Sequence, residues 1–127
     1  MGQTIAAIAL GGAAGSVARY LMAQAVASWL GRGFPWGTLS VNILGSMAMG
    51  VLFQLFTERL PTQEIWRLAL MVGVLGGFTT FSSFSLESVQ LFLQGEYRSA
   101  SAYIAASVGL CLVGTWMGWL LARTVGS

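Results

Sequence analysis

Four long stretches that are almost free of charged side chains account for nearly the whole of this 127-residue chain. Hydrophobic residues make up 56% of the sequence and charged residues 8%, whereas an average soluble domain carries about 25% charge. A helix that crosses a membrane needs roughly 20 consecutive apolar residues. The stretches that qualify are Thr4–Leu30 with Arg19 inside it, Phe34–Phe56, Leu68–Gln94 with Glu87 inside it, and Ser99–Ala122. The sequence therefore predicts an all-α integral membrane protein with four transmembrane helices in a single domain.

Short turn signals separate these stretches. Glycine and proline gather at 31–35, a proline follows a charged pair at 58–62, and a glycine stands between polar residues at 94–98. We expect helices over about 4–30, 35–57, 64–94 and 98–123. Because the three loops are short, neighbouring helices must run antiparallel, and the two termini must lie on the same side of the membrane.

Arginine is distributed almost evenly between the two sides of such a bundle. The side with the termini carries Arg59, Arg67 and Arg123, and the other side carries Arg32 and Arg98, with Arg19 approaching it. An excess of basic residues normally fixes the cytoplasmic side. A chain without that excess can insert both ways, and two opposite copies can pair as an antiparallel, dual-topology homodimer. The alternative is that a weak bias still selects one orientation.

The third stretch contains a segment that a lipid-facing helix does not need. Residues 76–85 read GGFTTFSSFS, a glycine pair followed by five hydroxyl residues and three phenylalanines. These residue types weaken a helix, so we expect a break near Gly76–Thr80. Backbone groups freed inside a membrane must face protein, water or an ion. The alternative is that the glycines form a packing notch and the hydroxyls bond back to carbonyls one turn earlier.

The residue types in and around this segment suit an anion. Hydroxyl and amide groups donate hydrogen bonds, and the edges of phenylalanine rings carry partial positive charge. Phe81 and Phe84 are three residues apart and share a helix face, and on the second helix Asn42 shares a face with Thr38. A polar face on the fourth helix is formed by Tyr103, Ser107 and Cys111.

Several function classes are disfavoured by composition. The chain has six arginines but no lysine or histidine, and it shows no basic patch for a nucleic acid. The single cysteine rules out a cysteine-based zinc cluster. No set of nucleophile and base is present, so we expect no enzymatic activity. The two charged residues inside the stretches, Arg19 and Glu87, are expected to line an aqueous vestibule or to pair.

Three blocks of sequence resemble the Fluc (CrcB) family of bacterial fluoride channels, and the resemblance runs over nearly the whole chain. The blocks are 11–20 (GGAAGSVARY), 37–46 (GTLSVNILGS) and 76–87 (GGFTTFSSFSLE). The resemblance implies a passive, fluoride-selective channel that exports fluoride across the bacterial inner membrane through two pores in an antiparallel dimer.

The resemblance also implies roles for individual residues. Arg19 would lie at the vestibule. A sodium ion at the dimer centre would be held by the backbone carbonyls of Gly76 and Thr79. The residues implied for the fluoride path are Phe81, Phe84, Asn42, Ser83, Ser107, Thr38 and Tyr103.

The alternative function is a proton-coupled exporter like the small multidrug resistance transporters, which are also four-helix, dual-topology proteins. Those depend on a glutamate in the first helix, and this first helix has none. Glu87 lies in the third helix instead. A third possibility, a purely structural subunit, would not need a hydroxyl-rich break.

Overall fold

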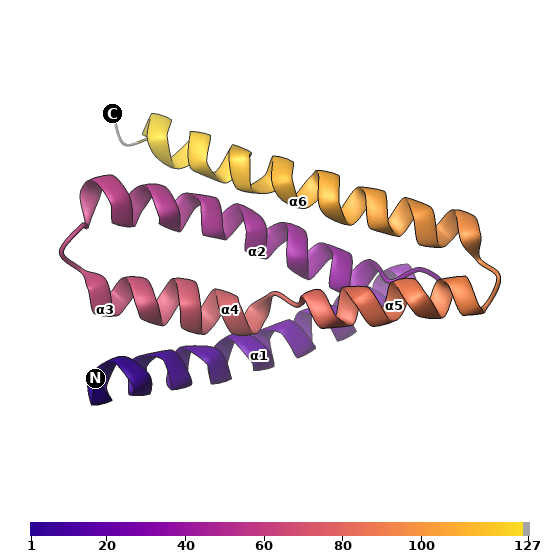
Figure 1. Cartoon of the computed structure of the whole chain (residues 1–127), viewed down its shortest axis with the longest axis horizontal. Coiled ribbons are helices and arrows are strands. Elements are labelled where there is room, and N and C mark those ends of the chain that lie inside the picture. Colours follow the sequence, from indigo (N-terminus) through magenta and orange to yellow (C-terminus); the bar gives the residue numbers. More distant parts are fainter. Residues whose placement is uncertain (126–127) are drawn as a thin grey trace.

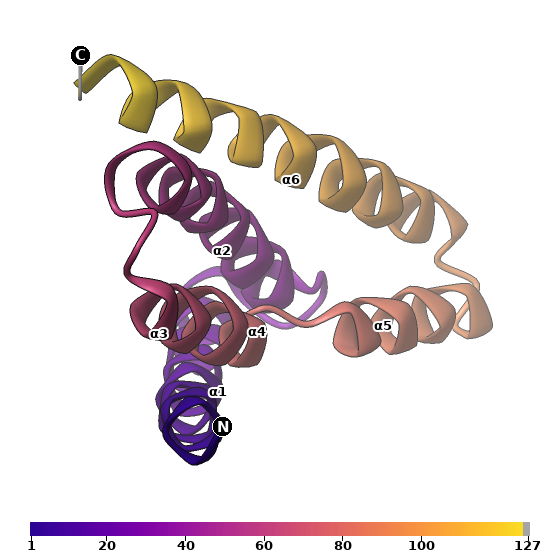
Figure 2. The ribbon, with the colours of Figure 1, turned by 60° about the vertical axis from the view of Figure 1, so that its left-hand side comes forward.

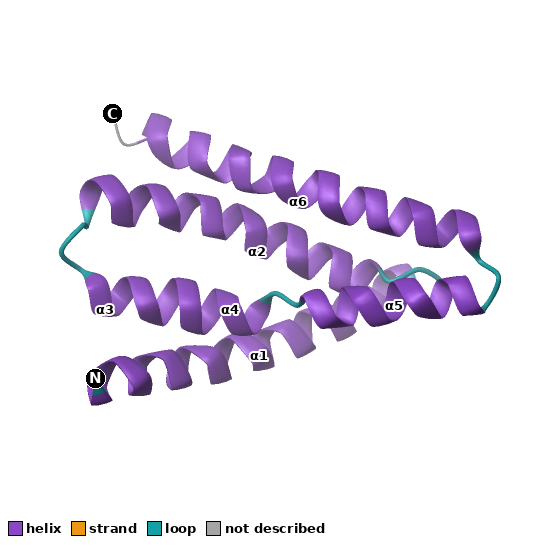
Figure 3. Ribbon diagram, viewed as in Figure 1, coloured by secondary structure: helices purple, strands orange, loops and turns teal. Residues whose placement is uncertain are grey.

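The computed structural model describes residues 1–125, and over that range it consists of helices and loops (Figure 3). Four of its helical segments are long and apolar enough to cross a membrane: Gly2–Leu30, Trp36–Arg59, Glu64–Leu93 and Tyr97–Val125. This confirms the prediction of an all-α membrane protein with four spans. The start of Gly2–Leu30 and the end of Tyr97–Val125 lie at the same end of the bundle (Figure 1), as short loops between antiparallel helices require.

Two of the spans are divided into several helical elements. The second consists of an α-helix and a wider π-helical turn, and the third consists of four elements separated by one break. In chain order the elements are α1 (Gly2–Leu30), α2 (Trp36–Gln54), η1 (Leu55–Arg59), α3 (Glu64–Arg67), η2 (Leu68–Val74), α4 (Leu75–Phe78), α5 (Phe81–Leu93) and α6 (Tyr97–Val125).

Glycine ends the third span where the sequence predicted a turn. Gly95 has a φ of 79°, a conformation that a residue with a side chain rarely adopts. Its N–H donates to the Phe92 carbonyl at 3.0 Å, and the Glu96 N–H donates to the Leu91 carbonyl at 2.8 Å. This pair of hydrogen bonds closes α5 and turns the chain back into α6.

Helix α1 packs against the first half of the third span with the two backbones in contact. A Cβ atom added to Gly15 would collide with the Val74 carbonyl oxygen, and one added to Gly77 would lie 2.6 Å from the Gly12 carbonyl oxygen. Each helix therefore presents glycine to the carbonyls of the other. Small residues drive helix association in membranes in this way, because apolar side chains gain little by leaving lipid.

Replacing Gly15 with alanine should separate these two helices. The added methyl group would meet a backbone oxygen, which cannot rotate away as a side chain would, and overpacking of this kind costs about 1–3 kcal/mol. We expect a lower melting temperature for the purified protein in detergent. Gly109 in α6 is the matched control, since nothing lies within 4 Å of its added Cβ. A Gly15→Ala protein that melts like the wild type would show that the contact does not hold α1 in place.

The two halves of the third span are anchored to different hydrophobic clusters. On one side of the break, Leu75 and Phe78 of α4 pack with Val41 of α2. On the other side, Leu91 of α5 packs in a separate cluster with Tyr103 of α6. Figure 2 shows the result, with α5 joined to α4 by a short extended segment. The break is therefore held from both ends.

The predicted break in the third helix is confirmed, and it lies at the C-terminal end of the predicted segment. Thr79 (φ −86°, ψ 157°) and Thr80 (φ −152°, ψ 117°) are extended, whereas the glycine pair remains helical in α4. Gly77 packs closely on α1, and the Thr79 hydroxyl donates to the Leu75 carbonyl at 2.9 Å. Both interpretations of the segment, the helix break and the packing notch, are therefore correct in part: Gly77 forms the notch, and the two threonines form the break.

Candidate functional site

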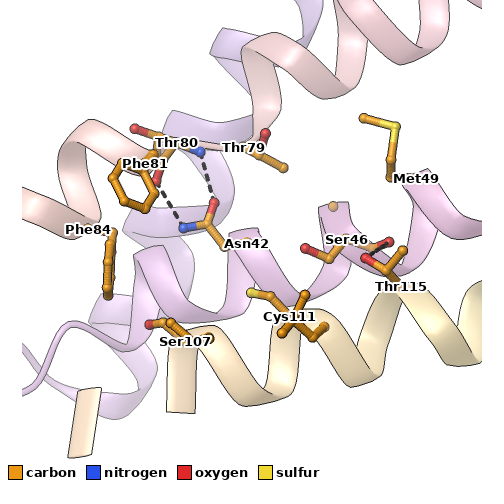
Figure 4. Close-up of a pocket in the computed structure, with 13 residues that line it drawn as sticks. Asn42, Ser46, Met49, Thr79, Thr80, Phe81, Phe84, Ser107, Cys111 and Thr115 are labelled. Atoms are coloured by element: carbon orange, nitrogen blue, oxygen red, sulfur yellow. Dashed lines mark hydrogen bonds between the residues drawn. The ribbon is translucent and has the colours of Figure 1, made fainter. Parts of the chain in front are cut away.

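Asn42 of α2 holds the break through both backbone groups of Thr80. Its Nδ2 donates to the Thr80 carbonyl at 3.0 Å, and its Oδ1 accepts from the Thr80 N–H at 2.8 Å (Figure 4). Backbone groups inside a membrane need such partners when no helix supplies them. A side-chain amide has two N–H donors, so Asn42 keeps one for another ligand. Sequence reasoning identified Asn42 as a donor but did not predict this clamp.

Thr80 caps the second half of the span, and sequence reasoning missed this residue. Its Oγ1 accepts from the Ser83 N–H at 3.2 Å and donates to Ser83 Oγ, also at 3.2 Å. Ser82 Oγ lies 3.3 Å from the same Oγ1. The signal was present in the sequence, because threonine is among the preferred residues immediately before a helix. A cap could not be assigned before the position of the break was known.

These contacts leave two backbone carbonyls of the break without their usual helical donors. The amide that would close a helical turn onto the Gly76 carbonyl is that of Thr80, and it donates to Asn42. The amide that would reach the Thr79 carbonyl is that of Ser83, and it donates to the Thr80 hydroxyl. No hydrogen bond among residues 1–125 reaches either carbonyl oxygen.

Free carbonyl oxygens at this position fit a hard cation such as sodium. The described residues contain no group of three His, Cys, Asp or Glu side chains that could hold a metal ion. A cation here would therefore be held by main-chain oxygens, which are hard ligands. The residues present fit the sodium ion that the family resemblance implies.

A cavity of 360 Å³ lies beside the break, between α2, α5 and α6. It brings together four of the predicted path residues, Asn42, Phe81, Phe84 and Ser107 (Figure 4). The rings of Phe81 and Phe84 have centroids 5.4 Å apart. Ser107 Oγ is buried without a hydrogen-bond partner among the described residues. A buried polar atom without a partner is rare, and here it faces the same space as an amide donor and two aromatic rings.

A second cavity, of 310 Å³, lies on the α1 side of the break. It contains the other predicted path residues of α2 and α5, Thr38 and Ser83, together with Arg19. No residue in the described part of the chain forms an ion pair or hydrogen bond with Arg19. The guanidinium charge is therefore available to an anion there. Thr80 lines both cavities, and it is the only residue that they share.

Tyr103 and Glu87 form a separate pair that lines neither cavity. The Tyr103 hydroxyl donates to Glu87 Oε1 at 3.3 Å. Tyr103 is fully buried, and its ring packs 5.3 Å from that of Phe84. Tyr103 therefore supports the phenylalanine wall of the first cavity from behind. Arg19 and Glu87, which were expected to line an aqueous vestibule or to pair, do not pair with each other: Arg19 lines the second cavity, whereas Glu87 accepts from Tyr103.

The break brings helix ends of opposite polarity together. Carbonyls at the end of α4 carry partial negative charge, and amides at the start of α5 carry partial positive charge. Broken helices in transport proteins use such ends to hold ions of both signs. The arrangement can therefore place a cation on the α4 side and an anion on the α5 side.

Comparison with known proteins gives a consistent picture. The profile of the family described as CrcB-like protein, Camphor Resistance (CrcB), matches residues 6–119. A protein of Magnetococcus marinus named "Fluoride-specific ion channel FluC" is 51% identical over 121 residues, which cover 95% of this chain and 98% of that one. A protein of Geobacter sulfurreducens with the same name is 53% identical over 121 residues, covering 94% and 97%.

Proposed function

Since this chain belongs to the CrcB-like family, we propose that it is a passive, fluoride-selective channel that exports fluoride across the bacterial inner membrane. It is a multi-pass protein of that membrane, with four helices long enough to span it. The relatives are named as channels, which does not favour the exporter alternative. As a channel, the protein would carry out no catalysis.

One observation carries the proposal, namely the unpartnered hydroxyl of Ser107 in a cavity with Asn42 and two phenylalanines. Ser107 and the second N–H of Asn42 would donate to fluoride, and the ring edges of Phe81 and Phe84 would supply partial positive charge. Thr38, Ser83 and Arg19 would serve the ion on the other side of the break. Tyr103 would hold the Phe84 ring in place. A narrow path dense in donors favours a compact anion over larger halides.

The working unit of this proposal is an antiparallel homodimer with two pores. Phe81 is 77% exposed in the single chain although it forms part of the cavity wall, so a second copy would complete that wall. The even distribution of arginine between the two ends supports insertion in both orientations. Topology reporters fused to the C-terminus should therefore report both orientations.

A sodium ion is part of the same proposal. The carbonyls of Gly76 and Thr79 from each subunit would hold it at the dimer centre, where the hydrogen bonds of this chain leave them free. When bound, the ion would supply a fixed positive charge that offsets part of the desolvation cost of an anion in the membrane. Glu87 would stay outside this site, bonded to Tyr103.

Ion efflux from liposomes that contain the purified protein tests the proposal. We expect rapid loss of fluoride and no loss of chloride when a potassium gradient sets the membrane voltage. A channel needs no proton gradient, so the flux should persist at equal pH on both sides. Fluoride retention by liposomes that carry verified dimers would refute the proposed function.

A further inference from the structure

Thr80 is the residue through which the two sides of the break are connected. It is 8% exposed, lies between the two cavities and lines both of them. Its backbone is fixed by Asn42. Its side chain is therefore held in one place, and the hydrogen bonds of that side chain reach residues on both sides.

The hydroxyl of Thr80 has a complete set of hydrogen-bond partners. A hydroxyl offers one donor and two acceptor positions. The donor goes to Ser83 Oγ, one acceptor position takes the Ser83 N–H, and Ser82 Oγ lies within reach of the other. Every hydrogen-bonding position of Thr80 Oγ1 is thus used within the break, and none is left for an ion.

The first consequence concerns the Thr79 carbonyl. If Thr79 and Thr80 became helical, the Ser83 N–H would donate to the Thr79 carbonyl, as in a continuous helix. By accepting that N–H at 3.2 Å, Thr80 Oγ1 stabilises the extended conformation in which the Thr79 oxygen stays free. A free oxygen there is what a cation at the break requires.

The second consequence concerns the Ser83 hydroxyl. Because Ser83 Oγ accepts from Thr80, its own proton is directed elsewhere, and no hydrogen bond of the described residues uses it. Ser83 lines the cavity that also contains Arg19. The hydroxyl therefore presents a donor to an anion in that cavity, beside an unpaired positive charge.

We infer that Thr80 is a positioning residue that keeps the Thr79 carbonyl free for a cation and the Ser83 hydroxyl free to donate to an anion. It touches neither ion itself and acts through Thr79 and Ser83. The inference rests on the proposed function and adds to it a residue that links the cation site to the anion path.

Thr80→Val tests this inference, because valine keeps the shape of threonine and removes the hydroxyl. In full-length protein purified without sodium, the sodium concentration that gives half of the maximal thermal stabilisation should rise about five- to tenfold. Fluoride efflux from liposomes should fall by a similar factor. Thr80→Ser keeps the hydroxyl and should restore both properties. Ser88→Ala is the matched control on α5, since the Ser88 hydroxyl donates to its own helix at the Phe84 carbonyl.

Ser83→Ala separates the two roles. It keeps the Ser83 N–H, so the response to sodium should match the wild type. At a sodium concentration that saturates every variant, fluoride efflux should fall as it does in Thr80→Val, and efflux from the double variant should be no lower than from Ser83→Ala alone, because the effect of Thr80 on the anion then runs only through Ser83.

Three results would overturn the inference. They are an unchanged sodium response in Thr80→Val, a failure of Thr80→Ser to restore the wild-type values, and a double variant whose loss of efflux at saturating sodium equals the product of the two single losses. The proposed function is tested separately by the wild type. A wild type without fluoride efflux refutes that function, whereas normal wild-type efflux with an unaffected Thr80→Val refutes only the role of Thr80.

Discussion

Replacing Phe81 and Phe84 together with isoleucine should slow fluoride efflux roughly a hundredfold while leaving a folded protein. Isoleucine keeps an apolar, branched side chain, so burial against Tyr103 is largely preserved. What it lacks is the aromatic ring, whose edge attracts an anion. If each ring edge contributes about 1.4 kcal/mol at the barrier, losing both should slow efflux roughly a hundredfold. The measurement is fluoride efflux from liposomes that contain equal amounts of dimer.

Phe92→Ile is the matched control for this pair. Phe92 lies at the far end of α5, where its ring contacts Tyr97 with centroids 6.0 Å apart, and it lines neither cavity. It should conduct like the wild type. Efflux from the Phe81→Ile, Phe84→Ile protein within threefold of the wild type would show that fluoride does not pass these rings.

The architecture could be predicted from the sequence because a membrane-spanning helix is recognised from consecutive residues alone. Span length and the absence of charge define Gly2–Leu30 and its three counterparts. The turn at Gly95 was visible in the same way. Within the third span, composition indicated that the helix breaks, since hydroxyl residues and glycine both weaken a helix.

The position of the break could not be predicted from composition. Glycine is a weaker helix former than threonine. Gly77 nevertheless remains helical, and its missing side chain allows α1 to pack closely against it. The chain opens instead at Thr79 and Thr80, where Asn42 from another helix supplies the partners that the backbone needs. A tertiary hydrogen bond thus decides which of several weak positions opens.

The arrangement of the site residues likewise depends on contacts between helices, and the sequence predicted it only in part. Shared helix faces marked Asn42, Phe81, Phe84 and Ser107 as polar or aromatic positions, the family resemblance implied that they line one path, and the structure brings them to one cavity. Face patterns did not reveal that Ser83 and Thr38 lie in a second cavity. Thr80 separates the two cavities, and which cavity a residue of α2 or α5 reaches depends on the packing between helices, which a face pattern does not contain.

Asn42→Leu should give the largest loss of stability among these variants, and with it the loss of conduction. Leucine is close to asparagine in size but leaves the Thr80 N–H and carbonyl without partners in a buried place. Each unpaired group costs about 1–3 kcal/mol, so about 2–6 kcal/mol is expected in total. Thermal unfolding of the purified protein in detergent, with and without sodium, measures this loss.

Asn42→Asp distinguishes the clamp from the direct contact with fluoride. The carboxylate can still accept from the Thr80 N–H, but it cannot donate to the Thr80 carbonyl, and it adds a negative charge beside the anion path. This variant should therefore be more stable than Asn42→Leu and equally unable to pass fluoride. If Asn42→Leu unfolds at the wild-type temperature, the backbone of the break does not depend on the amide. If Asn42→Asp conducts normally, Asn42 has no part in selecting the anion.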